Sequence, residues 1–364
     1  MSRILFQSET ANGTAVPASA YVLWPWMPRT DPETGRLAVV GWGHGTSGSF
    51  GECAPSHIRN LWYQYSAPYV LALQGYVVVA PDYAGLGVTH TAEGASIKHA
   101  YFAAAASAND LFHSVKAAQH AFPELSSRFV LMGHSQGGQA AWAAAERQAR
   151  QPVDGHLGTI AGSPVTDVES QLRLLPALAA LIGPYLAAGL DSVLPDYSAA
   201  DLLTERGLQR LELFKELQAC NNVGTVLLNA PGLVREDLLD TSAFQAFKHL
   251  ARVGGQPVAG PLLVLQGSAD SLVPAELSTQ AVNETCTSYP DSQLEYVLLN
   301  GTDHVATLDA GQRIWLDWIA DRFANKEIAC GCVRRNYSSF RPQDTYQANG
   351  NYYLEYATQS YQIA

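Results

Sequence analysis

A serine lies at the centre of the most informative stretch of this chain. Gly133-His134-Ser135-Gln136-Gly137 follows the apolar run 129–132 and precedes the alanine-rich segment 139–147. This pattern predicts a strand, a sharp turn and a helix with Ser135 at the apex, as in the G-x-S-x-G nucleophile elbow. The glycines allow strand and helix to approach without clashing side chains. We expect an exposed Ser135 Oγ, with the backbone N–H of Gln136 facing the oxyanion that its attack creates. The alternative is a turn that matches by chance.

A serine nucleophile needs a base, and the base needs an orienting acid. In proteins with this elbow the order along the chain is serine, acid and histidine, each beyond the end of a strand. Asp270 follows the apolar run 262–265, and His304 follows the run 294–299. We therefore predict a catalytic triad of Ser135, Asp270 and His304. Two alternatives stay open: Asp270 is only a turn-forming residue, or Asp303 is the acid.

The oxyanion of such a reaction needs a second backbone donor. Gly43-His44-Gly45-Thr46 follows the β-rich run 37–42, and the loop at this place supplies that donor in proteins with this elbow. Gly45 permits close approach, so the N–H of Thr46 is the predicted partner of Gln136 in the oxyanion hole. The alternative is that these glycines serve only a tight turn.

Aromatic residues and an apolar segment suggest a hydrophobic substrate pocket. The candidate pocket residues are Trp42, Tyr83 and His134, and the surrounding features are Phe50, Trp62, Tyr63 and the segment 174–190. His134 is also expected to point away from the face of the elbow that carries Ser135, as a packed and hydrogen-bonded neighbour. The alternative is that the aromatic residues are ordinary core.

The elements that must position these residues alternate between strands and helices. Predicted strands lie at 4–8, 18–23, 37–42, 76–80, 129–132, 156–161, 262–265 and 294–299, and predicted helices at 103–121, 139–147 and 310–323. Such alternation is typical of an α/β protein with a mostly parallel central sheet flanked by helices. The first two strands are expected to be antiparallel, with Asn12-Gly13 as their turn.

The alternation stops between about residues 164 and 257, where only helical patterns occur, including the periodic segment 202–219. We interpret 164–257 as an inserted helical cap, and 1–163 with 258–329 as the core. The remaining tail, 330–364, is polar but rich in tyrosine, which argues against disorder. It is expected to pack on the core, with a small hairpin as one form.

Composition narrows the classes of partner. Hydrophobic residues make up 47% of the 364-residue chain and charged residues 15%, which allows a large buried core. The formal net charge of −11 excludes nucleic acid as a partner, because no basic stripe is present to neutralise phosphates. The longest uncharged apolar run, 174–190, is interrupted by Pro176, Gly183 and Pro184, so we expect no integral membrane association. Oligomeric state is not predicted.

The cysteines bear on the compartment in which the protein works. Five are scattered along the chain without the spacing of a metal site, at positions Cys53, Cys220, Cys286, Cys330 and Cys332. No metal is therefore expected. Two disulfides and one remaining thiol would fit a secreted or periplasmic protein, and five reduced thiols would fit a cytoplasmic one. The N-terminus shows no signal-peptide pattern, so we expect a cytosolic chain or a mature form whose signal was removed.

Four motifs together resemble one family. They are His44-Gly45-Thr46-Ser47-Gly48, Cys53-Ala54-Pro55-Ser56, the segment from Pro81-Asp82-Tyr83 to Gly87, and Gly133 to Gly138. The chain resembles the secretory lipase family, the Candida lipase A type of α/β hydrolase, over about residues 8 to 325. The resemblance implies a Ser-Asp-His triad, a helical cap inserted before the strand of the acid, hydrolysis of carboxylic esters, no cofactor and export. It also implies a bridge from Cys53 to Cys220, and then a second from Cys286 to Cys330 or Cys332.

Taken together, these features predict a serine carboxylic-ester hydrolase that acts through an acyl-enzyme on hydrophobic acyl or aryl esters. The substrate would be a small-molecule or lipid ester. An amidase or peptidase with the same triad is one alternative, and Arg173, Arg206 and Arg210 of the cap leave open a site for a charged terminus. The other alternative is a non-catalytic binding protein on a hydrolase scaffold.

Overall fold

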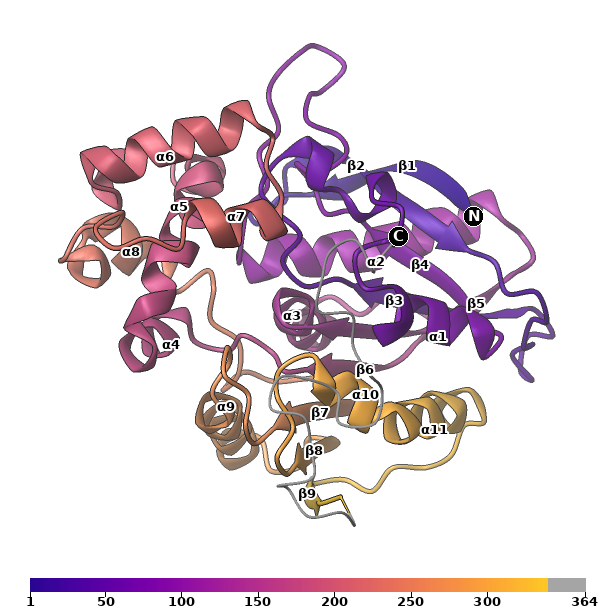
Figure 1. Cartoon of the computed structure of the whole chain (residues 1–364). Coiled ribbons are helices and arrows are strands. Elements are labelled where there is room, and N and C mark those ends of the chain that lie inside the picture. The colour runs from indigo at the N-terminus through magenta and orange to yellow at the C-terminus, as the bar shows by residue number, and fades with distance from the viewer. Residues whose placement is uncertain (340–364) are drawn as a thin grey trace.

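One mixed sheet forms the centre of the molecule, shown in Figure 1 as a computed structural model that describes residues 1–339. Within this range the strand order is β1-β2-β4-β3-β5-β6-β7-β8-β9. The strands are β1 Ser2–Glu9, β2 Ala15–Leu23, β3 Leu37–Gly43, β4 Val77–Pro81, β5 Leu125–His134, β6 His156–Gly162, β7 Leu262–Gly267, β8 Leu294–Leu299 and β9 Cys332–Tyr337. β1 pairs antiparallel with β2, and β2 antiparallel with β4, whereas the other pairs are parallel. The predicted mostly parallel sheet is confirmed.

Helices cover both faces of this sheet (Figure 1). One face packs against α2 Ala104–Ala121, α3 Gln136–Arg150 and α9 Ala275–Ser288. The other packs against α1 Pro68–Leu73, α10 Ala306–Ala310 and α11 Gln312–Phe323. A strand covered on both sides must be apolar on both sides, and every residue of β4 is accordingly buried. The final helix, predicted at 310–323, is α11, and the short α10 precedes it across Gly311.

The chain between β6 and β7 is helical, as predicted, and its helices lie together beside the sheet (Figure 1). They are α4 Val168–Leu174, α5 Ala179–Gly189, α6 Glu205–Glu216, α7 Asn221–Leu227 and α8 Ser242–Phe247. Their apolar faces form a core that includes Tyr185, Phe214, Phe244 and Phe247. We call this segment the cap, and its assignment to 164–257, with a core of 1–163 and 258–329, stays an interpretation.

No single helix within residues 1–339 is both long and apolar enough to cross a membrane. Among the described helices, one combination, α4 with 176–192, passes by length and composition, as a pair bent by 116°. The middle of this pair is buried among other helices of the cap, where Ile182, Tyr185 and Leu186 belong to its apolar core.

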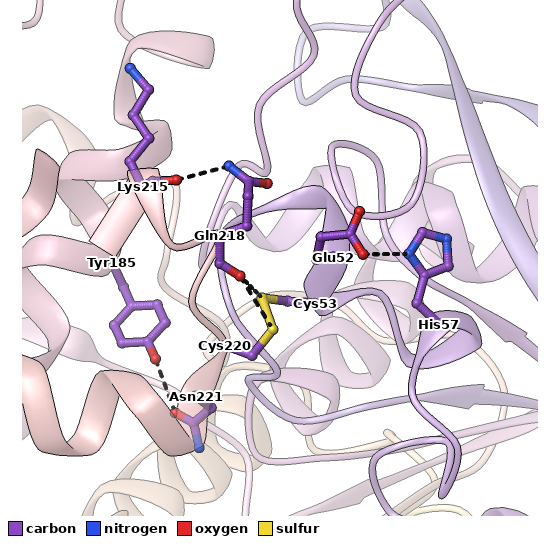
Figure 2. Close-up of a disulfide and its surroundings, with 8 residues drawn as sticks. All are labelled: Glu52, Cys53, His57, Tyr185, Lys215, Gln218, Cys220 and Asn221. Atoms are coloured by element: carbon purple, nitrogen blue, oxygen red, sulfur yellow. Dashed lines mark hydrogen bonds and ion pairs between the residues drawn. A yellow bond between two sulfur atoms is a disulfide. The ribbon is translucent and has the colours of Figure 1, made fainter. Parts of the chain in front are cut away.

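Two disulfides tie peripheral segments to the core. Cys53, in the loop after β3, is bonded to Cys220 at the start of α7, and Figure 2 shows this bond between the core and the cap. Cys286 of α9 is bonded to Cys332 of β9, while Cys330 is a free, exposed thiol. The expected first bridge is confirmed, and the second uses Cys332.

The structure describes the tail as far as residue 339. β9 extends the sheet as a strand parallel to β8, with Leu294 paired to Cys332 and Leu299 to Tyr337. This described part adds a single parallel strand. The remainder of the segment expected to pack as a hairpin, 340–364, lies outside the described residues.

Candidate active site

Ser135 lies at the turn between β5 and α3 and has φ 60° and ψ −119°. This left-handed φ is uncommon for a residue other than glycine. A Cβ atom at Gly133 would lie 2.0 Å from the carbonyl oxygen of Gly137, and one at Gly137 would lie 2.0 Å from that of Gly43. Backbone atoms therefore occupy the space that side chains would need at both positions. The predicted strand, turn and helix have formed, and both glycines are sterically required.

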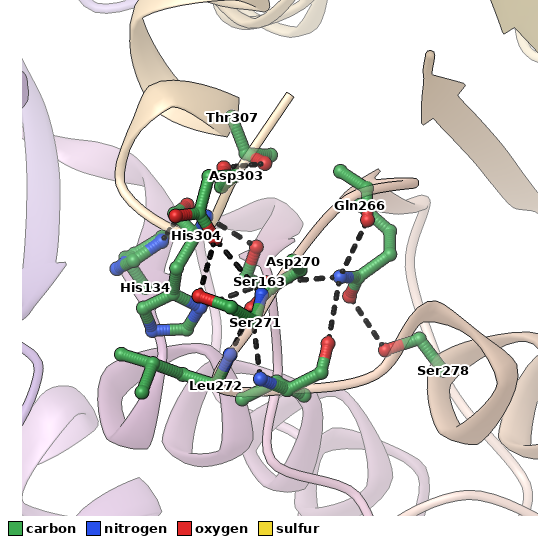
Figure 3. A network of polar contacts seen from close by, with 12 residues as sticks. His134, Ser163, Gln266, Asp270, Ser271, Leu272, Ser278, Asp303, His304 and Thr307 are labelled. Carbon is green, nitrogen blue, oxygen red and sulfur yellow. Dashed lines mark hydrogen bonds and ion pairs between the residues drawn. The ribbon is translucent and has the colours of Figure 1, made fainter. Parts of the chain in front are cut away.

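Asp270 and His304 meet beyond the ends of β7 and β8. His304 Nδ1 is 2.8 Å from Asp270 Oδ2, and both residues are buried (Figure 3). Asp270 Oδ1 accepts hydrogen bonds from the N–H groups of Leu272 and Val273, and Oδ2 accepts one from the side chain of Gln266. This network holds the carboxylate in one orientation against the imidazole.

The electrostatics of this pair favour an ionised acid. Burial acts to raise the pKa of Asp270, but the charge of His304, its hydrogen bond and the two backbone N–H donors outweigh burial, so the pKa is lowered. An ionised carboxylate accepts from Nδ1–H of His304, which leaves Nε2 able to accept a proton. Asp303, the alternative acid, uses Oδ1 to accept from the N–H and hydroxyl of Ser271 and from the N–H of His304. It therefore binds the backbone of its neighbour, while Asp270 binds the ring.

His134 binds the backbone of His304. Its Nε2 is 3.0 Å from the backbone oxygen of His304, and its Nδ1 is 2.7 Å from the hydroxyl of Tyr63. Burial, with the positive charge of His304 as a smaller cause, lowers the pKa of His134 to about 3, so the ring is neutral. A carbonyl oxygen can only accept, which places the single proton on Nε2 and makes Tyr63 the donor to Nδ1. His134 is the packed, hydrogen-bonded neighbour that was expected, and it does not line the cavity described below.

The loop after β3 lies against the elbow, because Gly43 of β3 is in register with Gly133 of β5. A Cβ atom at Gly45 would lie 3.2 Å from Cβ of Ser135. Thr46 Oγ1 donates a hydrogen bond of 3.1 Å to the side-chain oxygen of Gln136. Within residues 1–339 the N–H of Thr46 donates to no other group, and that of Gln136, the first residue of α3, has no partner inside its helix. Both proposed oxyanion donors thus belong to segments in direct contact.

Two residues that sequence reasoning missed complete this contact. The side-chain nitrogen Nε2 of Gln136 is 2.9 Å from His99 Nε2, and the hydroxyl of Tyr101 is 3.0 Å from Thr46 Oγ1. Burial lowers the pKa of His99 to about 4, so its ring is neutral and Nε2 accepts from Gln136. Both residues lie in a loop without a motif or a periodic pattern, and no signal in the sequence marks them.

A cavity of about 460 Å³ opens above Ser135 and is bounded by the core and the cap. Ser135, His304 and Thr46 line it together. Its apolar and aromatic wall includes Trp62, Tyr63, Tyr101, Phe102, Val165, Leu178, Leu181, Ile182, Tyr185, Leu272 and Val273. A polar edge comes from Asn221, Asn222 and Thr225 of α7. Among the described lining residues there is no lysine, arginine, aspartate or glutamate, so Arg173, Arg206 and Arg210 are not part of the wall.

None of the three predicted pocket residues lines this cavity: His134 binds the backbone of His304, as described above, and the other two also need correction. Trp42 and Tyr83 are fully buried and do not line this cavity. Trp42 packs edge-on against Tyr63, at 5.4 Å between ring centroids, and the hydroxyl of Tyr83 donates to the backbone oxygen of His44. They support the wall and the loop from the core side. Phe50 lines a separate cavity next to α6.

A parallel-rich sheet that carries a serine elbow, and an acid and a histidine beyond later strands, defines the α/β-hydrolase class. The chain belongs to the secretory lipase family, whose family model matches residues 61–331. Lipase 5 of Candida albicans is 24% identical over 306 residues, which cover 77% of this chain. This chain spans 64% of the length of that relative.

Solved structures share the fold. Candida antarctica lipase A in its closed state matches with a TM-score of 0.71 at 18% identity, over 92% of this chain and 80% of that one. The rice cell wall degrading esterase LipA from Xanthomonas oryzae matches with a TM-score of 0.62 at 17% identity, over 90% and 89%. At these identities the similarity concerns the fold.

Proposed function

We propose that this protein is a serine carboxylic-ester hydrolase. The observation that carries the proposal is a single cavity lined by Ser135 and His304, with His304 Nδ1 held 2.8 Å from the buried Asp270. Membership of the secretory lipase family supports the same reaction.

In the proposed mechanism, Ser135 Oγ attacks the ester carbonyl carbon while its proton passes to His304 Nε2. The N–H groups of Gln136 and Thr46 stabilise the negative charge on the carbonyl oxygen. When the C–O bond to the alcohol breaks, the alcohol takes the proton from His304 and leaves an acyl ester on Ser135. Water then attacks that ester and gives its proton to His304. The acid departs, and the proton returns to Ser135.

The cavity supports uncharged, apolar substrates. Its volume lies within the range of sites for small organic ligands, and its wall is largely aliphatic and aromatic. Esters with short to medium acyl chains or aryl groups fit this description. A peptidase that recognises a charged terminus needs an ionic partner in the site, and the described wall offers none. We therefore place ester hydrolysis ahead of peptide hydrolysis.

We also propose that the protein works outside the cytoplasm, in a secreted or periplasmic form. Disulfides persist in oxidising compartments and are rare in the cytosol. Two are present, and one of them, between Cys53 and Cys220, joins the core to the cap.

Hydrolysis of p-nitrophenyl esters of increasing acyl length, run beside an aminoacyl p-nitroanilide, tests the activity. We expect kcat/KM to be highest for short to medium chains and at least 100-fold lower for the anilide. The variant Ser135→Ala should lose a factor on the order of 10⁴ in kcat and remain folded. Comparable rates on ester and anilide would favour an amidase. Ester hydrolysis that is absent from the wild type, or equal in both proteins, would contradict the proposal.

A further inference from the structure

Trp62 occupies a strained turn at the edge of the catalytic cavity. Leu61 and Trp62 have φ of 52° and 69°, values that non-glycine residues seldom adopt. The N–H of Tyr63 donates to the backbone oxygen of Leu61 at 2.9 Å. A bond between residues two apart with positive φ at the centre is the rare, strained form of γ-turn. Asn60 Oδ1 accepts from the N–H of Trp62 and helps to hold the turn. Strain of this kind is concentrated at functional sites, which raises the question of what the turn achieves.

The turn directs the indole of Trp62 at the loop after β3, which carries Gly45 and Thr46. Trp62 Nε1 is 3.1 Å from the backbone oxygen of Gly45. An indole N–H can only donate, so the direction of this hydrogen bond is unambiguous.

His44 is a second possible donor to the carbonyl of Gly45, but only in the tautomer that carries its proton on Nδ1. Its Nδ1 is 2.7 Å from the oxygen of Gly45, while its Nε2 is 3.3 Å from the backbone oxygen of Asp82. Burial lowers the pKa of His44 to about 4, so the neutral ring has one proton for two carbonyl acceptors. Trp62 is therefore the donor that the carbonyl of Gly45 has in either tautomer of His44.

The orientation of the Gly45 carbonyl determines the direction of the Thr46 N–H, the proposed oxyanion donor. The C=O of Gly45 and the N–H of Thr46 belong to one peptide unit, which is planar and trans, so the two groups point in opposite directions. No peptide bond within residues 1–339 is cis. Glycine has the greatest backbone freedom of any residue, and this peptide would otherwise rotate easily about its flanking bonds.

We propose that Trp62 is a positioning residue for the oxyanion hole. By holding the carbonyl of Gly45 from one side, its indole N–H aims the N–H of Thr46 at the place where the oxyanion forms. The inference rests on the proposed ester hydrolysis and adds a residue to it. A donor that is already oriented needs no reorganisation when charge develops, and this is the main source of oxyanion stabilisation.

The test is Trp62→Phe, which removes the N–H and keeps an aromatic ring in the cavity wall. Trp26→Phe is the matched control, because Trp26 is 98% exposed and does not line the cavity. Loss of a direct oxyanion donor lowers kcat by about 10²–10³. For loss of a residue that only orients one, we expect a decrease of about tenfold or more in kcat, with KM changed less than threefold. A trifluoromethyl ketone forms an oxyanion on Ser135, and its inhibition constant should rise by a similar factor. The inhibition constant of the matching methyl ketone should stay unchanged.

Other outcomes would overturn the inference. If KM rises while kcat stays the same, or if both ketones weaken equally, Trp62 only shapes the cavity wall. Equal losses in Trp62→Phe and Trp26→Phe would show an effect unrelated to the site.

A crystal structure of Trp62→Phe separates this inference from the proposed function. A rotated or disordered Gly45–Thr46 peptide supports the positioning role, and a peptide in its present orientation contradicts it. This reading holds even if the wild type hydrolyses no ester, a result that would refute the proposed function alone.

Discussion

Replacing Asp270 with asparagine should abolish most activity because the structure determines which way the new amide faces. Oδ1 of Asp270 accepts from the N–H groups of Leu272 and Val273, at 3.0 and 2.8 Å. An amide nitrogen cannot accept these bonds, so the oxygen of the asparagine must remain there. Its NH₂ group then takes the place of Oδ2 and faces His304 Nδ1.

This exchange would reverse the tautomer of His304. Nδ1 would accept from the amide, the ring proton would move to Nε2, and Nε2 could no longer accept the proton of Ser135. A wrong tautomer of this kind costs about 10⁴ in kcat, or about 5.5 kcal/mol of transition-state stabilisation. The new NH₂ group would also face the side-chain N–H of Gln266, so we expect a smaller decrease in the free energy of unfolding, of about 1–3 kcal/mol.

Steady-state hydrolysis of the best p-nitrophenyl ester, with circular dichroism to confirm folding, measures both effects. Asp303→Asn is the matched control, because Asp303 precedes His304 and contacts its backbone but not its ring. We expect it to lose less than tenfold in kcat. The reasoning is refuted if a folded Asp270→Asn keeps more than a tenth of wild-type kcat, or if Asp303→Asn loses more activity than Asp270→Asn.

Three further predictions concern stability. Replacing Cys53 and Cys220 with serine removes a bridge across 167 residues and should lower the free energy of unfolding in guanidinium by about 2–5 kcal/mol. Burial raises the pKa of Glu146 from 4.5 to about 7, so the wild type loses stability as pH rises between these values. Glu146→Gln keeps an oxygen for the N–H of Gly254, and its stability relative to wild type should improve by about 3 kcal/mol from pH 4 to pH 8. Gly137→Ala places a Cβ 2.0 Å from a backbone oxygen and should give little folded protein, judged by soluble yield and melting temperature.

Each of these predictions has an outcome that would contradict it. The disulfide prediction uses Cys330→Ser as its control, because that thiol is free and exposed, and it fails if both changes have equal effects. The prediction for Glu146 fails if the stability difference between variant and wild type does not change with pH. A well-folded Gly137→Ala with wild-type stability would show that the elbow tolerates a side chain.

The candidate catalytic residues could be predicted from sequence because each follows from a local pattern. Ser135 is marked by its own turn, and Asp270 and His304 by the ends of apolar strands. Parallel strands bring those ends to one edge of a sheet, so the order along the chain is enough to assemble them. The cap was visible as an interruption in the same alternation.

The surroundings of the site could not be predicted in the same way. Trp42 and Tyr83 are aromatic residues near the ends of core strands, and residue type alone does not say whether such a ring faces the core or the cavity. Trp62 and Tyr83 have positive φ, a conformation that their residue types disfavour and that tertiary contacts impose. His99 reaches Gln136 from a loop without a pattern, so only the folded chain reveals the contact.

The central claim, that Ser135 is the nucleophile, is tested most directly by covalent labelling with a fluorophosphonate followed by peptide mass spectrometry. We predict one label per chain, located on Ser135, together with loss of ester hydrolysis in proportion to labelling. We also predict that Ser135→Ala is not labelled. A label on another residue, or unchanged hydrolysis after full labelling of Ser135, would contradict the account.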